Sequence, residues 1–130
     1  GGQGRYIVWL RQGLIVFPNP TAADFDAGWL EASPAEVIVV PRGRRNRGWE
    51  LCLRAESGTM GGGGYAKPVS DIQFRQEGSG TWTPLTTANQ LLAVGDRYRR
   101  VRLQFRVALD WERDVPGTYR TDYTASAAKQ

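Results

Sequence analysis

Residues 101–111 show the clearest alternation of hydrophobic and polar side chains in the chain. Every odd position is apolar, and every even position is Arg, Gln, Ala or Asp. Because successive side chains of a β-strand point to opposite faces, this pattern predicts one long strand with an apolar wall and a solvated wall. The apolar wall needs a second layer to cover it. A Pro-Gly turn at 116–117 and a second alternating run at 118–125 predict a β-hairpin near the C-terminus.

The rest of the chain consists of short β-branched and aromatic runs separated by Gly and Pro. These runs predict strands at residues 5–10, 14–17, 25–30, 36–40, 49–55, 72–75, 82–85 and 91–94. For residues 21–33, one helical turn capped by Thr21 is the alternative, and Gly28 argues against a long helix. Alternation in residues 49–55 places Cys52 opposite the apolar side chains, as a half-exposed residue.

These elements predict an all-β fold, an immunoglobulin-like β-sandwich of about eight to ten short antiparallel strands. The 130 residues make one domain of ordinary size, 1–130. Residues 42–48, RGRRNRG, are predicted to form the tip of a hairpin. The four glycines at 61–64 predict a loop, because so many glycines cost too much conformational entropy inside a strand or helix. This loop is not expected to bind phosphate, because the lysine pattern and the helix of a phosphate-binding loop do not follow the glycines.

The chain carries a formal charge of +4, and its cations gather in local clusters. One cluster is the predicted hairpin tip, with Arg42, Arg44, Arg45 and Arg47. Guanidinium groups bind phosphates and sulfates, so this tip is a candidate contact for a polyanion or for a neighbouring subunit. A solvated tip is the simplest interpretation. Among polyanions an anionic glycan is favoured over nucleic acid, since Trp49 faces the core instead of offering a stacking platform.

The sequence argues against an enzyme. It contains no His and a single Cys, which excludes Ser/His/Asp and Cys/His mechanisms and His-ligated zinc. Asp110, Glu112 and Asp114 alternate at a predicted strand end, where carboxylates can meet a hard cation. The other features of a calcium loop are missing, so they are expected to be turn-flanking acids. We expect no catalytic residue, metal or cofactor, and no apolar run is long enough to span a membrane.

Residues 101–125 resemble the C-terminal strands of secreted bacterial immunoglobulin-like sandwiches, of the spore coat protein U and chaperone–usher pilin-like type. In those domains a GTY turn leads into the last alternating strand, as PGTYRTDYTA does here. The LIVFPNPT opening and the EVIVV and WELCLRA runs add looser similarity. The chain departs from those families because it has no disulfide pair and ends in AAKQ without an apolar tail. The resemblance implies a non-enzymatic, extracellular structural or adhesive domain.

We therefore expect a subunit that assembles with other copies of itself into a pilus, filament or surface layer at the cell surface. Residues 1–17 are predicted to add as a strand to a neighbouring copy. The contact residues would be Tyr6, Ile7, Val8, Trp9 and Leu10. The alternative for this segment is the first strand of its own domain. The alternative function is a binding module for an anionic glycan or nucleic acid through the Arg-rich hairpins.

Overall fold

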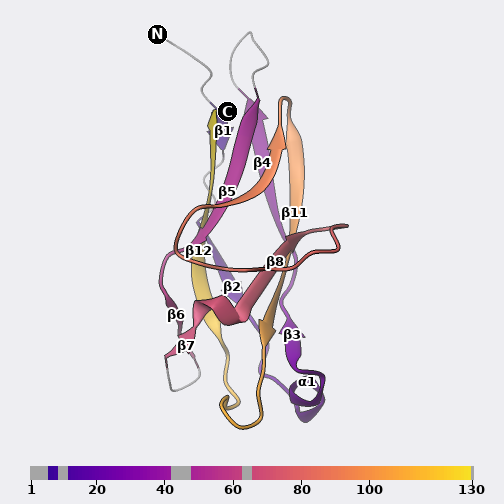
Figure 1. Cartoon of the computed structure of the whole chain (residues 1–130), viewed down its shortest axis with the longest axis vertical. Helices are drawn as coiled ribbons and strands as arrows, with labels where there is room; N and C mark the ends of the chain where they lie inside the picture. The colour runs from indigo at the N-terminus through magenta and orange to yellow at the C-terminus, as the bar shows by residue number, and fades with distance from the viewer. Residues whose placement is uncertain (1–5, 9–11, 42–47, 63–65, 130) are drawn as a thin grey trace.

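The computed structural model describes residues 6–8, 12–41, 48–62 and 66–129 (Figure 1). Its helical elements are α1 (Ala22–Ala27) and the 3-10 turn η1 (Val69–Asp71). Its strands are β1 (Tyr6–Val8), β2 (Gln12–Val16), β3 (Trp29–Glu31), β4 (Ala35–Pro41), β5 (Trp49–Ala55), β6 (Thr59–Met60), β7 (Lys67–Pro68), β8 (Ile72–Gln76), β9 (Thr83–Pro84), β10 (Gln90–Gly95), β11 (Arg99–Ala108) and β12 (Arg120–Lys129). Two more strands are present than the sequence predicts, because β6 and β7 are two residues long, too short to show an alternation.

The strands pair antiparallel and form two main sheets that enclose one hydrophobic core (Figure 1). Sheet A has the order β1-β4-β11-β8-β9, and β3 pairs with β11 beyond the end of β4. Sheet B has the order β10-β5-β12-β2, and β6 pairs with β7. The predicted β-sandwich is confirmed.

The core forms from the inward side chains of the long strands. Those of β5 and β11 are buried as the alternation predicts: Trp49, Leu51, Leu53, Val101, Leu103, Phe105 and Val107. Cys52 lies on the opposite side of β5 and is half-buried, also as predicted. Burial, with a smaller contribution from Glu50, raises the pKa of the Cys52 thiol.

The predicted C-terminal hairpin is wrong, because β11 and β12 lie in different sheets. Both sides of β11 are filled, by β4 and β3 on one side and by β8 on the other. β12 pairs instead with β5 and β2. Residues 109–119 therefore cross from sheet A to sheet B. β4 and β5 likewise lie in different sheets, so they do not pair as the predicted hairpin, and residues 42–47 between them lie outside the described residues.

A helix replaces the first part of the strand predicted at residues 25–30. The Thr21 hydroxyl accepts a hydrogen bond from the Asp24 backbone N–H, and the Asp24 carboxylate accepts one from the Thr21 N–H at 2.8 Å. This capping box satisfies N–H groups that the first helical turn would otherwise leave without a partner. Gly28 then ends α1 with a φ of 89°, and β3 begins at the next residue.

Trp111 lies outside the core, contrary to the prediction for the apolar wall of residues 101–111. β11 ends at Ala108, and the chain then enters a turn after the buried Leu109. The exposed indole stacks on Phe25 of α1 with ring centroids 4.7 Å apart, and its Nε1 donates to the Asp26 carboxylate at 2.9 Å. Trp111 therefore packs on α1 instead of between the sheets.

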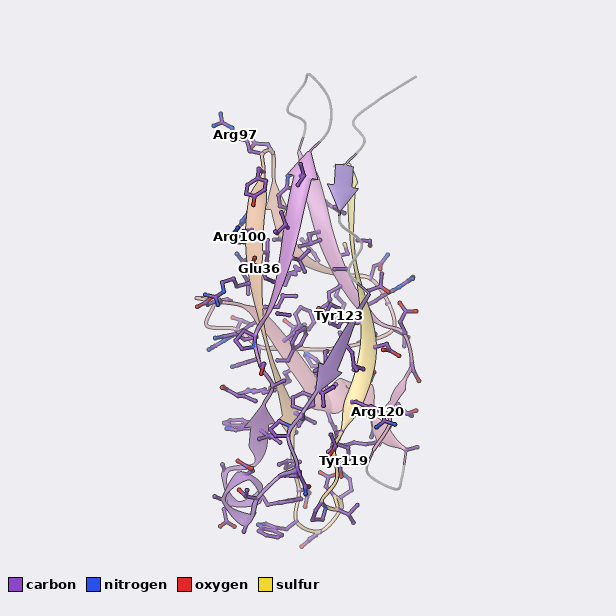
Figure 2. The ribbon with its side chains drawn as sticks, turned by 180° about the vertical axis from the view of Figure 1, so that it is seen from behind. Glu36, Arg97, Arg100, Tyr119, Arg120 and Tyr123 are labelled. Carbon is purple, nitrogen blue, oxygen red and sulfur yellow. The ribbon has the colours of Figure 1, made fainter. Side chains whose placement is uncertain are left out.

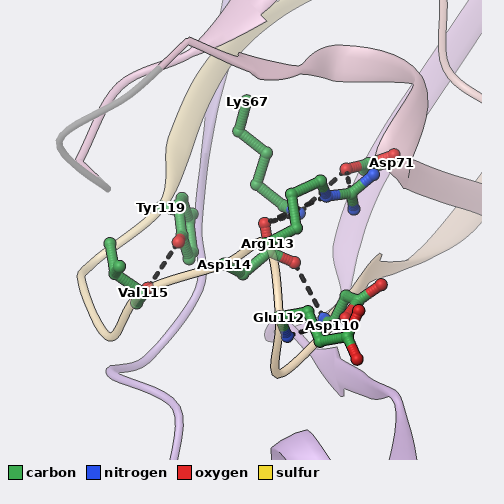
Figure 3. A network of polar contacts seen from close by, with 8 residues as sticks. All are labelled: Lys67, Asp71, Asp110, Glu112, Arg113, Asp114, Val115 and Tyr119. Carbon is green, nitrogen blue, oxygen red and sulfur yellow. Dashed lines mark hydrogen bonds and ion pairs between the residues drawn. The ribbon is translucent and has the colours of Figure 1, made fainter.

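A buried ion-pair network fixes the turn after β11 (Figure 3). Lys67 is fully buried, and its Nζ lies 2.8 Å from both the Asp71 and the Asp114 carboxylates. Arg113 contacts the same two carboxylates, at 2.7 Å and 3.5 Å. Two cations thus balance two carboxylates, and the network joins β7 and η1 to the turn.

The carboxylates considered for a cation serve this turn instead. An Asp114 carboxylate oxygen accepts the Asp110 N–H at 2.9 Å, and the Asp110 carboxylate accepts the Glu112 N–H at 2.8 Å. Asp110 and Asp114 are therefore turn-stabilising acids. Within the described ranges, no group of three His, Cys, Asp or Glu residues is arranged to hold a metal ion. None of the helices in those ranges has the length and apolar character needed to cross a membrane.

Candidate functional site

The strands β1 and β2 lie at the edges of sheet A and sheet B, respectively. β1 pairs only with Val39–Pro41 at the end of β4. β2 is the edge strand of sheet B, and among the described residues it pairs with one strand, β12. The other edge of β2 can therefore accept a further strand.

β2 borders a groove that has a volume of about 290 Å³. Its walls come from β2 and from the segment that leads into β4, and its floor comes from the core. The lining residues are Leu14, Ile15, Val16, Ala32, Ser33, Pro34, Ala35, Phe105 and Tyr123. The Phe105 and Tyr123 rings lie 5.6 Å apart, centroid to centroid, and both side chains are buried. The groove therefore has an aromatic floor between β2 and residues 32–35.

Gly13 allows this floor to form. Tyr123 is its register partner on β12, and Figure 2 shows Tyr123 beside β2. A Cβ atom on Gly13 would lie 2.2 Å from the Tyr123 ring, closer than any two such atoms can pack. Only glycine lets the ring lie this close to the β2 backbone. A second hollow of about 400 Å³ continues along the same strand, lined by Gly13, Leu14, Glu56, Asp122 and Tyr123.

Exposed apolar side chains mark both edges of sheet B. On β2, Leu14 is 57% exposed and Val16 is 43% exposed. On β10, at the opposite edge, Leu91 is 61% exposed and Val94 is 44% exposed. Of these two strands, β2 lines the groove with the aromatic floor and β10 does not. Substitutions on β10 can therefore serve as controls for the same substitutions on β2, because the exposed apolar side chains of the two strands have similar exposure.

The predicted assembly residues lie next to this groove only in part. The backbone of Tyr6–Val8 pairs with β4 of its own chain. Trp9 and Leu10 lie outside the described residues. The pairing of this segment with a neighbouring copy stays a prediction. Arg42, Arg44, Arg45 and Arg47 also lie outside the described residues, so the proposed polyanion contact of that loop stays a prediction as well.

Sequence reasoning missed two features. Lys67 is a buried cation, and its partners lie 4 and 47 residues away in the chain, which no local pattern indicates. Arg75 and Arg106 share the outer face of sheet A with two tryptophans. A signal for the second feature exists in the sequence, because residues 73–75 and 104–106 both read Gln-Phe-Arg.

Comparison of the chain with models of protein families, with curated proteins and with solved structures gave no match in any of the three. The function therefore has to be argued from the geometry.

Proposed function

We propose that this protein is a non-enzymatic, extracellular structural subunit that assembles into a filament or surface layer. One copy would add a strand to the open side of the next. The observation that carries this proposal is the groove beside the edge strand β2, with Phe105 and Tyr123 as its floor. Strand addition gains main-chain hydrogen bonds along an edge and specificity from pockets that accept alternate side chains.

The N-terminal segment of a neighbouring copy is the proposed occupant. Residues 6–10 read YIVWL, so an extended strand would have apolar side chains on both of its faces. One face would meet the groove, and the other would be covered by the exposed apolar residues of β2. A head-to-tail contact of this kind does not close on itself, so it builds an open filament. The resemblance of residues 101–125 to pilin-like and spore coat protein U domains supports the extracellular location.

Lysine substitutions on β2 should abolish assembly without unfolding the protein. In Leu14→Lys/Val16→Lys, both changed side chains are exposed, so the melting temperature should stay within a few degrees of the wild type. Charges on an edge strand oppose the pairing of a further strand. Sedimentation velocity and negative-stain electron microscopy should show polymers for the wild type and monomers for the variant.

Leu91→Lys/Val94→Lys is the matched control. It adds the same charge, at almost the same exposure, to the other edge of the same sheet. It should assemble like the wild type. Equal loss of assembly in both variants would mean that added charge alone prevents association. A wild type that stays monomeric, or assembly that persists in the β2 variant, would refute the proposal.

Deletion of residues 1–12 tests the identity of the donor. It removes β1 and only the first residue of β2, so β2 keeps most of its pairing with β12. The truncated chain should be a folded monomer, and a synthetic peptide of residues 1–12 should bind to it. Circular dichroism and fluorescence anisotropy of the labelled peptide measure these two outcomes. If the truncated chain unfolds, the segment is an indispensable strand of its own sandwich and the donor assignment is wrong.

A further inference from the structure

A repeated tripeptide places two arginines close together on the outer face of sheet A. Residues 73–75 of β8 and 104–106 of β11 both read Gln-Phe-Arg. The two strands pair antiparallel, and their register sets each arginine opposite the glutamine of the other strand. The central phenylalanines are buried in the core, so the arginines and glutamines point outward.

Each arginine is held in place by the glutamine opposite to it. Arg106 Nε donates to the Gln73 side-chain oxygen at 2.6 Å, and Arg75 Nε donates to the Gln104 side-chain oxygen at 2.6 Å. These bonds use the inner nitrogen of each guanidinium group. The terminal nitrogens remain for other acceptors, and the orientation of each fork is set in advance.

Two tryptophans stack on the same guanidinium groups. The Arg106 Cζ lies 3.9 Å from the centroid of the Trp29 ring and 4.3 Å from that of Trp82. The Arg75 Cζ also lies 4.3 Å from the Trp82 ring centroid. We call Trp29, Arg75, Trp82 and Arg106 the arginine–tryptophan face. Stacking on indole holds the planar cations firmly and partly removes them from water.

The two arginines of this face lack a carboxylate partner at ion-pair distance among the described residues. Glu31 lies opposite Arg106 in the register of β3 and β11, and it acts only at longer range. Burial, and then the charge of Arg75, lower the pKa of Arg106, while Glu31 opposes this shift. Two like charges are therefore held together without full compensation.

Other arginines on the outer face of sheet A are compensated. Arg100 pairs with Glu36 at 3.3 Å, and Figure 2 shows the two labelled residues next to each other. Arg102 pairs with Glu77, also at 3.3 Å. The uncompensated charge thus lies specifically where the forks are fixed by glutamine and tryptophan.

We infer that the arginine–tryptophan face binds the acidic groups of a linear anionic polysaccharide, with Arg75 and Arg106 each gripping one carboxylate or sulfate. Guanidinium forks match the geometry of these groups and form charge-assisted hydrogen bonds with them. Single-stranded nucleic acid is disfavoured, because it needs bare aromatic rings for base stacking, and both indoles here already carry a guanidinium group.

Binding to three immobilised polysaccharides tests the inference: heparin for sulfate, polygalacturonate for carboxylate, and dextran as the neutral reference. The wild type should bind at least one of the acidic chains and not dextran, with affinity that falls as salt is added. Arg75→Gln/Arg106→Gln should weaken that binding by about tenfold or more, because each variant residue loses a charged donor. Arg75→Lys/Arg106→Lys keeps the charge but loses the fork, so it should bind at an intermediate level.

Arg100→Gln/Arg102→Gln is the matched control, since it removes the same charge from the same face of sheet A at residues that have glutamate partners. It should bind nearly as well as the wild type, and melting curves should show all variants folded. If the control variant lost as much binding, the effect would be one of general electrostatics and the inference would be overturned. The inference would also be overturned if the wild type bound neither acidic polysaccharide, or if it bound a single-stranded oligonucleotide more tightly. The face is separate from the groove at β2, so either result leaves the assembly proposal unaffected.

Discussion

Replacing Lys67 by methionine should lower the free energy of unfolding by about 3 to 5 kcal/mol. Lys67 is fully buried, and its Nζ contacts the carboxylates of Asp71 and Asp114 at 2.8 Å. Methionine has a similar volume, so little packing is lost. In the variant, Arg113 at 3.5 Å takes over as the cation beside the buried Asp114 carboxylate, and an insufficiently compensated buried charge is strongly destabilising.

Urea denaturation followed by intrinsic fluorescence measures this loss. The double variant Lys67→Met/Asp114→Leu removes both buried charges, so it should recover a substantial part of the lost stability. Recovery should be incomplete, because Asp114 also accepts the Asp110 N–H that holds the turn. A loss below about 1 kcal/mol for Lys67→Met would show that the network adds little to stability.

Phe105→Ala should lower the free energy of unfolding by about 3 to 5 kcal/mol. The side chain is buried between the sheets and packs near the Tyr123 ring of the opposite sheet. Its removal leaves an empty space between the sheets, below the groove, that neighbouring strands cannot close, since both sides of β11 are paired. The same urea titration, combined with far-UV circular dichroism of the folded state, gives the measurement.

Arg102→Ala is the control for Phe105→Ala. Arg102 lies on the outer face of the same strand. Apart from the small contribution of its exposed ion pair with Glu77, its replacement should change the free energy of unfolding by about 0.5 kcal/mol or less. Similar losses in the two variants would show that the two faces of β11 do not differ in burial. A circular dichroism spectrum dominated by helix would contradict the sandwich itself.

The faces of the long strands could be predicted because they depend on local sequence. In β5 and β11 the period of two tells which side chains point inward, whatever the neighbouring strands are. The partner of each strand depends on the whole fold. Residues 116–117 contain a good turn sequence, yet the chain there passes between sheets because β11 already has strands on both sides. Alternation thus predicts which side chains of a strand point into the core, but it does not predict which strands pair with that strand.

The other differences between prediction and structure concern α1, Trp111 and the groove at β2. The first two depend on nearby residues, and the third depends on parts of the chain that lie farther away. Thr21 and Asp24 form a local capping pair, with Gly28 at the other end of α1, and this local signal outweighs the apolar spacing of residues 25–30. Trp111 continues the alternation of β11 past the end of the strand, and a turn closed by Asp114 decides its position. The groove at β2 depends on which edges remain unpaired, so a single sequence could not locate it.

The pairing of β2 with β12 also determines when the protein can fold. Gln12 lies opposite Thr124, so sheet B joins nearly the first described residues to nearly the last. Contacts so distant in sequence are closed late and make folding slow. During synthesis from the N-terminus, β2 and its exposed Leu14 have no partner strand until β12 has left the ribosome. Newly made chains therefore pass through a stage in which both edges of β2 are open to other chains. A chain that is terminated before β12 remains in this stage.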